Sequence, residues 1–156
     1  MKKILTALVI SLFVLSIPLA AQAGSLGALE AKASALLGQG YRSALQNQAY
    51  QYGVVFAYSD NTEYWWSGLV LFNLAESANS LMVGCFDPEG NAVAAGTFSL
   101  EANALRADLL GDFMSSGAVS GRVSIAIFGT EAFLADRFVG NDAGGFGEIE
   151  KEAALY

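Results

Sequence analysis

The sequence of 156 residues contains no histidine, a single cysteine and only two prolines. Without histidine, the chain can build neither a nucleophilic triad based on imidazole nor a zinc site of histidine and cysteine ligands. It also lacks a glycine-rich loop that carries the lysine of a phosphate-binding loop. These absences exclude several common catalytic and cofactor sites, so we expect no enzymatic activity, no cofactor and no metal centre.

The lone cysteine, Cys85, lies in the apolar stretch SLMVGCF. One thiol cannot form an internal disulfide, so packing alone must stabilise the fold. A reactive thiol needs an electropositive neighbourhood. An apolar neighbourhood is typical of a free cysteine that is buried as a small hydrophobic residue. We therefore expect Cys85 to be buried.

Basic residues are scarce, with eight lysines and arginines against 15 acidic residues. Lys2 and Lys3 precede a long apolar stretch, and the small residues of the AQA tripeptide end it at Ala23. This order is typical of a signal peptide, which we expect to span residues 1–23 with cleavage after Ala23. A retained membrane anchor is the alternative, but Pro18 interrupts the apolar stretch.

After this cleavage, six basic side chains remain against 15 acidic ones, which gives a formal net charge of −9. Such a chain is a poor candidate for binding nucleic acid or an anionic membrane surface. We therefore expect an exported protein, periplasmic or extracellular, without a membrane anchor after cleavage. Its 133 residues are the size of one ordinary domain.

Three segments are expected after the signal peptide: a helical segment at 24–48, a β-sandwich domain at 49–147 and an acidic tail at 148–156. In the first segment, apolar residues recur at three- and four-residue steps, which predicts a helix from about Leu26 to Leu37. The apolar stripe comprises Leu26, Leu29, Ala33, Leu36, Leu37, Tyr41 and Leu45. We expect it to pack on the domain's own sheet; a partner helix and poor order are the alternatives.

From Ala49 onward, short stretches rich in β-branched and aromatic residues alternate with turn residues, as strands and turns do. The tetrapeptide DPEG at 87–90 fits a type I turn and predicts a hairpin over about Leu81–Leu100. In GRVSIAIFG at 121–129, alternation predicts one face on a core and the other facing water or a light cover. The tail allows a last short strand or helix.

The segment EANALRADLLGDF at 101–113 is interpreted as a short helix or a compact crossover. No other helical segment separates successive strands, which argues against a parallel, doubly wound sheet. The sequence therefore predicts a mainly β fold: an antiparallel β-sandwich, or a partly closed barrel, with an N-terminal α-helix and a short helical crossover.

Four motifs follow one another in an order that resembles the immunoglobulin-like β-sandwich domains of exported bacterial proteins. They are WSGLVLFN at Trp66–Asn73, then CFDPEGNAV, LRADLLGDF and GRVSIAIF, and the resemblance covers about Tyr58 to Val139. The resemblance implies a structural or adhesive module. It implies no catalytic residue, because the group has no common one, and it supports a fold more than a function.

The stretch EYWWSGLVLFN at 63–73 is apolar on both faces of its predicted strand. One set of alternate residues contains Trp66, Val70 and Phe72, and the other contains Trp65, Leu69 and Leu71. We expect the first set to fill the core and the N-terminal helix to cover the second. The alternative is an exposed binding patch at Tyr64, Trp65 and Trp66, since tryptophan and tyrosine dominate binding hot spots.

Two groups of acidic residues are the remaining candidates for chemistry. Asp108 and Asp112 would share one face of a helix, but a catalytic acid pair needs burial to raise one pKa, so we expect solvated side chains. The stretch NDAGGFGEIE lacks the alternating ligands of an EF-hand loop. We therefore expect a non-catalytic structural or protein-interaction module whose partner is itself or another exported protein. The alternative is a module that binds a small ligand or carbohydrate through Tyr64, Trp65 and Trp66.

Overall fold

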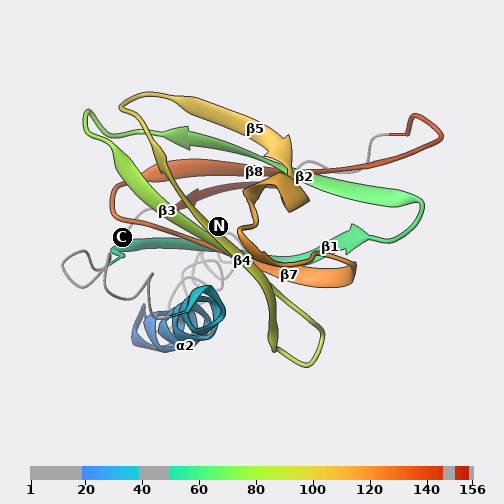
Figure 1. The fold of residues 1–156 in the computed structure, drawn as a ribbon. Helices are drawn as coiled ribbons and strands as arrows, with labels where there is room; N and C mark the ends of the chain where they lie inside the picture. Colours follow the sequence, from blue (N-terminus) through green and yellow to red (C-terminus); the bar gives the residue numbers. More distant parts are fainter. Residues whose placement is uncertain (1–18, 39–49, 146–149, 155–156) are drawn as a thin grey trace, which may run out of the picture.

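The computed structural model describes residues 19–38, 50–145 and 150–154. Its strands form two antiparallel sheets that pack face to face, with a helix on the outer side of one sheet (Figure 1). This confirms the predicted mainly β fold: an antiparallel β-sandwich with an N-terminal α-helix. The expected signal peptide lies largely outside the described residues.

The five-stranded sheet has the order β1-β7-β3-β4-β6. Its strands are β1 (Tyr52–Asn61), β7 (Gly121–Gly129), β3 (Asn79–Phe86), β4 (Ala92–Leu100) and β6 (Ser116–Gly117). The four-stranded sheet has the order β5-β2-β8-β9. Its strands are β5 (Leu105–Leu109), β2 (Trp65–Asn73), β8 (Phe133–Asn141) and β9 (Glu150–Ala154).

The predicted hairpin is formed by β3 and β4, with the register Leu81↔Phe98 and Cys85↔Ala94. At its turn, the amide of Gly90 donates to the carbonyl of Asp87 at 2.9 Å, and Gly90 has φ 79°, a conformation that glycine adopts without strain. The side chain and the amide of Asn91 both donate to the Asp87 carboxylate, which lowers the pKa of Asp87.

The core between the sheets is built from alternate residues of the facing strands, as the period of a β-strand requires. On β7, the apolar set predicted to face a core does so, and Ala126 and Phe128 on its other face are covered by the helix. Cys85 is fully buried in this core, as predicted. The largest buried core side chains include Phe56, Leu69, Leu71, Leu81, Ile125, Ile127 and Phe133.

Helix α2 (Leu19–Leu37) packs across the outer side of the five-stranded sheet. A Cβ at Gly84 would lie 2.8 Å from the Cβ of Ala33, so this glycine permits the close approach of helix and sheet. Lys32 donates to the carbonyl of Gly90, and Ser116 donates to the carbonyl of Leu36. The helix therefore packs on the domain's own sheet, as predicted; Tyr41 and Leu45 lie outside the described residues.

Residues 105–113 differ from the expectation of a short helix. Residues 105–109 form β5, an edge strand paired with β2, and only Leu110–Phe113 make a single turn of 3-10 helix. The physical reason is an alternation in the sequence, because Leu105, Ala107 and Leu109 share one face of a strand. At the other edge, β9 pairs with β8 inside the range assigned to the acidic tail.

Candidate functional site

The three aromatic residues considered as an alternative binding patch do not form one surface. Tyr64 precedes β2 and is 67% exposed, and Trp65 at the start of β2 is 40% exposed. Trp66 is half-buried on the opposite face of the strand, where its ring makes an edge contact with Phe138 at 5.8 Å between centroids. The structure therefore places Trp66 with a different set of neighbours from Trp65.

The expected assignment of the two faces of β2 is wrong. Leu69 and Leu71 fill the sandwich core, whereas Trp66, Val70 and Phe72 point outward and are half-buried. Helix α2 covers the five-stranded sheet and does not cover β2. The polar residues Ser67 and Asn73 share the inward face and are buried with hydrogen-bond partners, so the inward face of this strand is not purely apolar.

The outward side chains of β2, β5 and β8 together form an apolar surface on the four-stranded sheet. The pairing of the strands places Phe72 beside Leu105 and Leu134, and Val70 beside Ala107 and Asp136. Leu105, Leu109 and Leu134 are 60%, 50% and 41% exposed. We call this surface the outer face; it comprises Trp66, Val70, Phe72, Leu105, Ala107, Leu109, Leu134 and Phe138.

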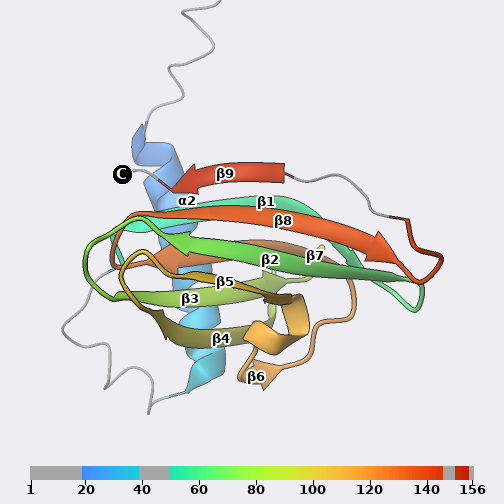
Figure 2. The same ribbon diagram turned by 90° about the horizontal axis from the view of Figure 1, so that it is seen from above.

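No described element covers the outer face. Helix α2 lies on the far side of the other sheet (Figure 1), and β5, β2, β8 and β9 lie side by side when seen from above (Figure 2). Monomeric proteins rarely expose a contiguous apolar patch larger than a few hundred Å², and larger ones mark sites of interaction. The outer face is therefore the strongest candidate for a functional surface among the described residues.

Two glycines leave room for the aromatic rings of the outer face. Gly68 lies directly opposite Phe138, and a Cβ at Gly68 would be 2.1 Å from the ring of Phe138. In the same way, a Cβ at Gly140 would be 2.2 Å from the ring of Trp66, which lies opposite. Each aromatic ring thus lies over the backbone of a glycine, and the two rings are at 79° to one another.

The outer face is almost free of charge. Asp136 is the one ionisable residue at the outward positions of β2, β5 and β8. Arg106 and Asp108 lie on the other face of β5 and form an ion pair at 2.7 Å. The guanidinium of Arg106 lies 4.6 Å and 4.4 Å from the ring centres of Phe98 and Phe113, so these charges border the core.

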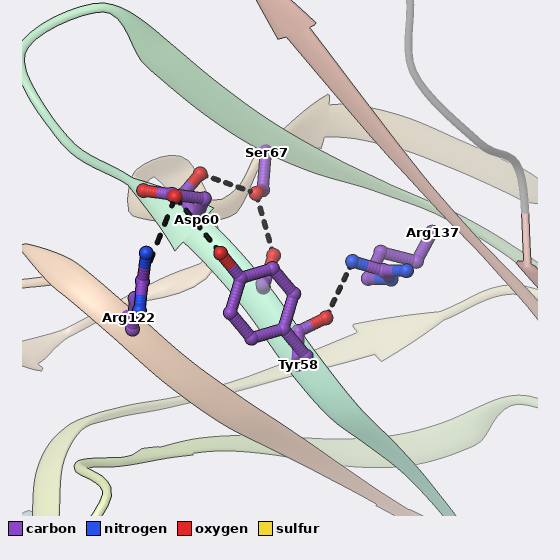
Figure 3. A network of polar contacts seen from close by, with 6 residues as sticks. Tyr58, Asp60, Ser67, Arg122 and Arg137 are labelled. Atoms are coloured by element: carbon purple, nitrogen blue, oxygen red, sulfur yellow. Dashed lines mark hydrogen bonds and ion pairs between the residues drawn. The ribbon is translucent and has the colours of Figure 1, made fainter.

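A polar network lies at the end of the sandwich where β1 turns into β2 (Figure 3). The hydroxyl of Ser67 donates to the carbonyl of Asp60, and the hydroxyl of Tyr58 donates to the Asp60 carboxylate at 2.9 Å. Arg137, which is 7% exposed, donates to the carbonyl of Tyr58 beside a bulge in β1. These contacts tie β1 to β2 and β8.

A cavity of about 240 Å³ lies between α2 and the start of β1. Burial raises the pKa of the Glu30 carboxyl, and no hydrogen bond or ion pair joins Glu30 to another described residue. The lining is largely aromatic and aliphatic, apart from Glu30 and Gln51. It comprises Leu26, Gly27, Glu30, Tyr50, Gln51, Tyr52, Gly53 and Phe128.

The acidic residues considered for chemistry do not form a paired site. Asp108 is paired with Arg106, and Asp112 lies in the 3-10 turn and not on a shared helical face with Asp108. Asn141 accepts hydrogen bonds from the amides of Ala143 and Gly145 and shapes a turn. Among residues 19–38, 50–145 and 150–154, no group of three acidic or cysteine side chains is arranged to hold a metal ion.

Sequence reasoning missed the contribution of β5 and β8 to the candidate surface. The signal was present in the alternation of Leu105, Ala107 and Leu109 with charged residues, which indicates a strand with one apolar face. It was hidden because the same leucines also suit a short helix.

Comparisons with known proteins leave the family open. No protein family matches the sequence. No curated protein matches it either. Within the described part of the chain, no helix has the length and apolar character needed to cross a membrane.

Several solved structures are similar to this chain at low identity. The Anabaena sensory rhodopsin transducer has a TM-score of 0.48 and 8% identity, over 56% of this chain and 95% of that chain. Thermotoga maritima 1070 has a TM-score of 0.45 and 8% identity, over 70% and 96%. FlgD from P. aeruginosa has a TM-score of 0.34 and 14% identity, over 69% and 75%. Since all three TM-scores are below 0.5, function must be derived from the surface of the molecule itself.

Proposed function

We propose that this protein is an exported, non-catalytic structural or interaction module that binds another protein surface through the outer face. The observation that carries the proposal is the contiguous apolar surface of β2, β5 and β8, which no described element covers. Burying exposed apolar area contributes roughly 25 cal/mol per Å², so a surface of this kind favours association.

The shape and charge of the outer face favour a protein as the binding partner. Small molecules bind in concave sites that enclose most of their surface, whereas the cavity beside α2 is lined by none of the outer-face residues. The scarcity of charge on the face is unfavourable for nucleic acid, whose binding depends on contacts from lysine and arginine to phosphate groups.

A photo-crosslinking experiment tests the proposal. A photoreactive phenylalanine analogue at Leu134, on the outer face, should give a protein adduct when the chain is irradiated in its extracytoplasmic fraction. The matched control carries the analogue at Val55, which is equally exposed at 40% but lies on β1 in the other sheet. Adducts from position 134 alone support the proposal, and equal or absent adducts from both positions contradict it.

Export is the part of the proposal that rests on the N-terminal segment. Its basic start, apolar stretch and AQA tripeptide support cleavage after Ala23. N-terminal sequencing of the protein recovered from outside the cytoplasm should therefore begin at Gly24. A protein that keeps residues 1–23 would contradict the cleavage.

A second candidate function is the binding of a small organic amine, which the cavity beside α2 favours. An ammonium group would pair with the Glu30 carboxylate, and aromatic rings such as those of Tyr52 and Phe128 attract cations. Benzylamine should raise the melting temperature, whereas uncharged benzyl alcohol should not, and Glu30→Gln should remove the effect of the amine. Equal shifts with both compounds, or none, would exclude this function.

A further inference from the structure

We infer that the partner is engaged at the free edge of β5, where an extended segment of another protein adds to the four-stranded sheet as an antiparallel strand. This inference rests on the proposed function and names the kind of segment that binds. In strand addition, backbone hydrogen bonds supply affinity and alternate side chains supply specificity. The added strand would lie beyond β5 in the order β5-β2-β8-β9 and would widen the outer face.

The pairing of β5 with β2 leaves alternate backbone groups of β5 unpaired. In an antiparallel ladder, directly opposed residues alternate between hydrogen-bonded and non-hydrogen-bonded pairs. The amide of Asn73 donates to the carbonyl of Ala104 at 3.0 Å, so this pair is hydrogen-bonded. Counting along the register from it places Leu105 and Ala107 in non-hydrogen-bonded pairs. The backbone N–H and C=O groups of these two residues therefore point away from β2.

The pairing of β2 with β8 leads to the same assignment. The amide of Leu74 donates to the carbonyl of Ala132 at 3.1 Å, so the even-numbered residues of β2 bond to β8 and the odd-numbered ones bond to β5. Within the described part of the chain, no hydrogen bond from another element reaches the backbone of Leu105 or Ala107. Their donors and acceptors are thus directed outward at the border of the sandwich, where Figure 1 shows β5.

β5 is the least protected edge of the two described sheets. Proteins shield edge strands from further pairing with bulges, short strands or charged side chains. β1 has a bulge between Phe56 and Ser59, β6 has only two residues, and β9 has the sequence EKEAA. By contrast, β5 has five residues in unbroken register with β2. Its charged residues, Arg106 and Asp108, lie on the inward side and pair with each other, so the outward side of this edge is apolar.

The side chains of β5 define the sequence that the added segment needs. Residues opposite Leu105, Ala107 and Leu109 would share the outer face with them. Leu105 and Leu109 are 60% and 50% exposed, and the small Ala107 between them leaves room for a large aliphatic side chain. The intervening residues would lie on the side of the ion pair of Arg106 and Asp108, which favours polar side chains. The occupant is therefore an extended peptide in which aliphatic and polar residues alternate.

Two methylated peptides test strand addition. The probe is the fluorescein-labelled peptide Thr-Val-Thr-Ile-Thr-Val-Thr, whose binding to the purified mature protein is followed by fluorescence anisotropy. N-methylation of its aliphatic residues removes the N–H groups that would face β5, and should weaken binding at least about tenfold. The matched control is methylated on the last three threonines, whose amides would point away from β5. This control should bind within about threefold of the unmodified peptide.

Ala107→Pro tests the same edge from the side of the protein. Proline lacks the N–H group, and an edge strand tolerates it where that group would face solvent. Because the amide of Ala107 takes no part in the pairing with β2, the variant should remain folded, which urea unfolding would establish. It should bind the unmodified peptide at least about tenfold more weakly, whereas Ala107→Ser keeps the N–H group and should bind within about threefold of the unchanged protein. Should Ala107→Pro unfold, the two methylated peptides still decide the question.

The crosslinking experiment separates this inference from the proposed function. Selective weakening by the methylated aliphatic residues, together with a protein adduct from position 134, supports both. A peptide that does not bind at about 1 mM, or that binds equally in both methylated forms, overturns strand addition; an adduct from position 134 then retains the proposed function. Absence of both peptide binding and the adduct overturns both.

Discussion

Asn73 at the end of β2 is the side chain whose replacement we expect to affect folding most. It is fully buried, and its amide nitrogen lies 2.8 Å, 3.1 Å and 2.9 Å from the carbonyl oxygens of Ser77, Leu100 and Glu101. Its side-chain oxygen accepts a hydrogen bond from the amide of Ala75 at 3.0 Å. One side chain thus joins the β2–β3 connection to the end of β4.

Replacing Asn73 by alanine removes all of these contacts. A net hydrogen bond is worth about 1 kcal/mol, and a buried group left without a partner costs about 1–3 kcal/mol. With several carbonyl groups and one amide affected, we expect Asn73→Ala to lower the free energy of unfolding by about 3–5 kcal/mol. This is a large part of the ~5–15 kcal/mol that stabilises an ordinary domain.

Urea unfolding followed by tryptophan fluorescence measures this loss. With a slope of about 2 kcal/mol per molar urea, the midpoint should fall by roughly 2 M. The control is Asn91→Ala at the exposed hairpin turn, where the Asn91 side chain bonds only to Asp87. This variant should lower the free energy of unfolding by about 0.5 kcal/mol. Asn73→Asp keeps the shape of the side chain. At pH 7 it should lower the free energy of unfolding at least as much as Asn73→Ala does, because a carboxylate would face the same carbonyl oxygens. A loss below about 1 kcal/mol for both variants at position 73 would refute the reasoning, since it would mean that these contacts are not structural.

Two further predictions concern the core. Burial raises the pKa of the Cys85 thiol to about 12, so Ellman's reagent at pH 8 should react only after urea unfolds the protein. Above about pH 8.5 the thiol of the unfolded chain loses its proton, whereas the buried thiol of the folded protein keeps it. The free energy of unfolding should therefore fall by up to about 1.4 kcal/mol for each pH unit above 8.5. Comparing Cys85→Ala with the unchanged protein over this range isolates the effect, and equal slopes would contradict it. Gly96→Ala should prevent folding or lower the free energy of unfolding by more than about 3 kcal/mol, because the new Cβ would lie 1.7 Å from the backbone oxygen of Phe113. Gly68→Ala is the control, because its Cβ would clash with the movable ring of Phe138. The urea midpoint of Gly68→Ala should therefore shift far less than that of Gly96→Ala.

Much of the fold follows from local patterns in the sequence. The stripe of apolar residues from Leu26 to Leu37 predicts the helix, and the DPEG turn predicts the β3–β4 hairpin. The alternation in β7 predicts which of its side chains enter the core. These features depend on neighbours within a few residues, which the sequence displays directly.

Of the two interpretations of 101–113, the short helix is wrong for 105–109 because the deciding contact is not local. Leucine and alanine suit both a short helix and a strand, and pairing with β2 selects the strand for 105–109. In the same way, an isolated sequence gave no sign that buried Asn73 would bond to carbonyl groups about 28 residues away. The burial of this polar side chain was therefore decided by tertiary contacts.

The sequence by itself determined that β2 has two apolar faces, that charge is scarce along it, and that strands dominate after residue 49. Only the tertiary structure decided which face is inward and which residues share the outer one. Alternation states which side chains lie together within a strand, but the side that faces the core depends on the packing of the two sheets. The outer face exists because antiparallel pairing brings Leu105, Phe72 and Leu134 side by side from three strands, and no local pattern encodes that encounter.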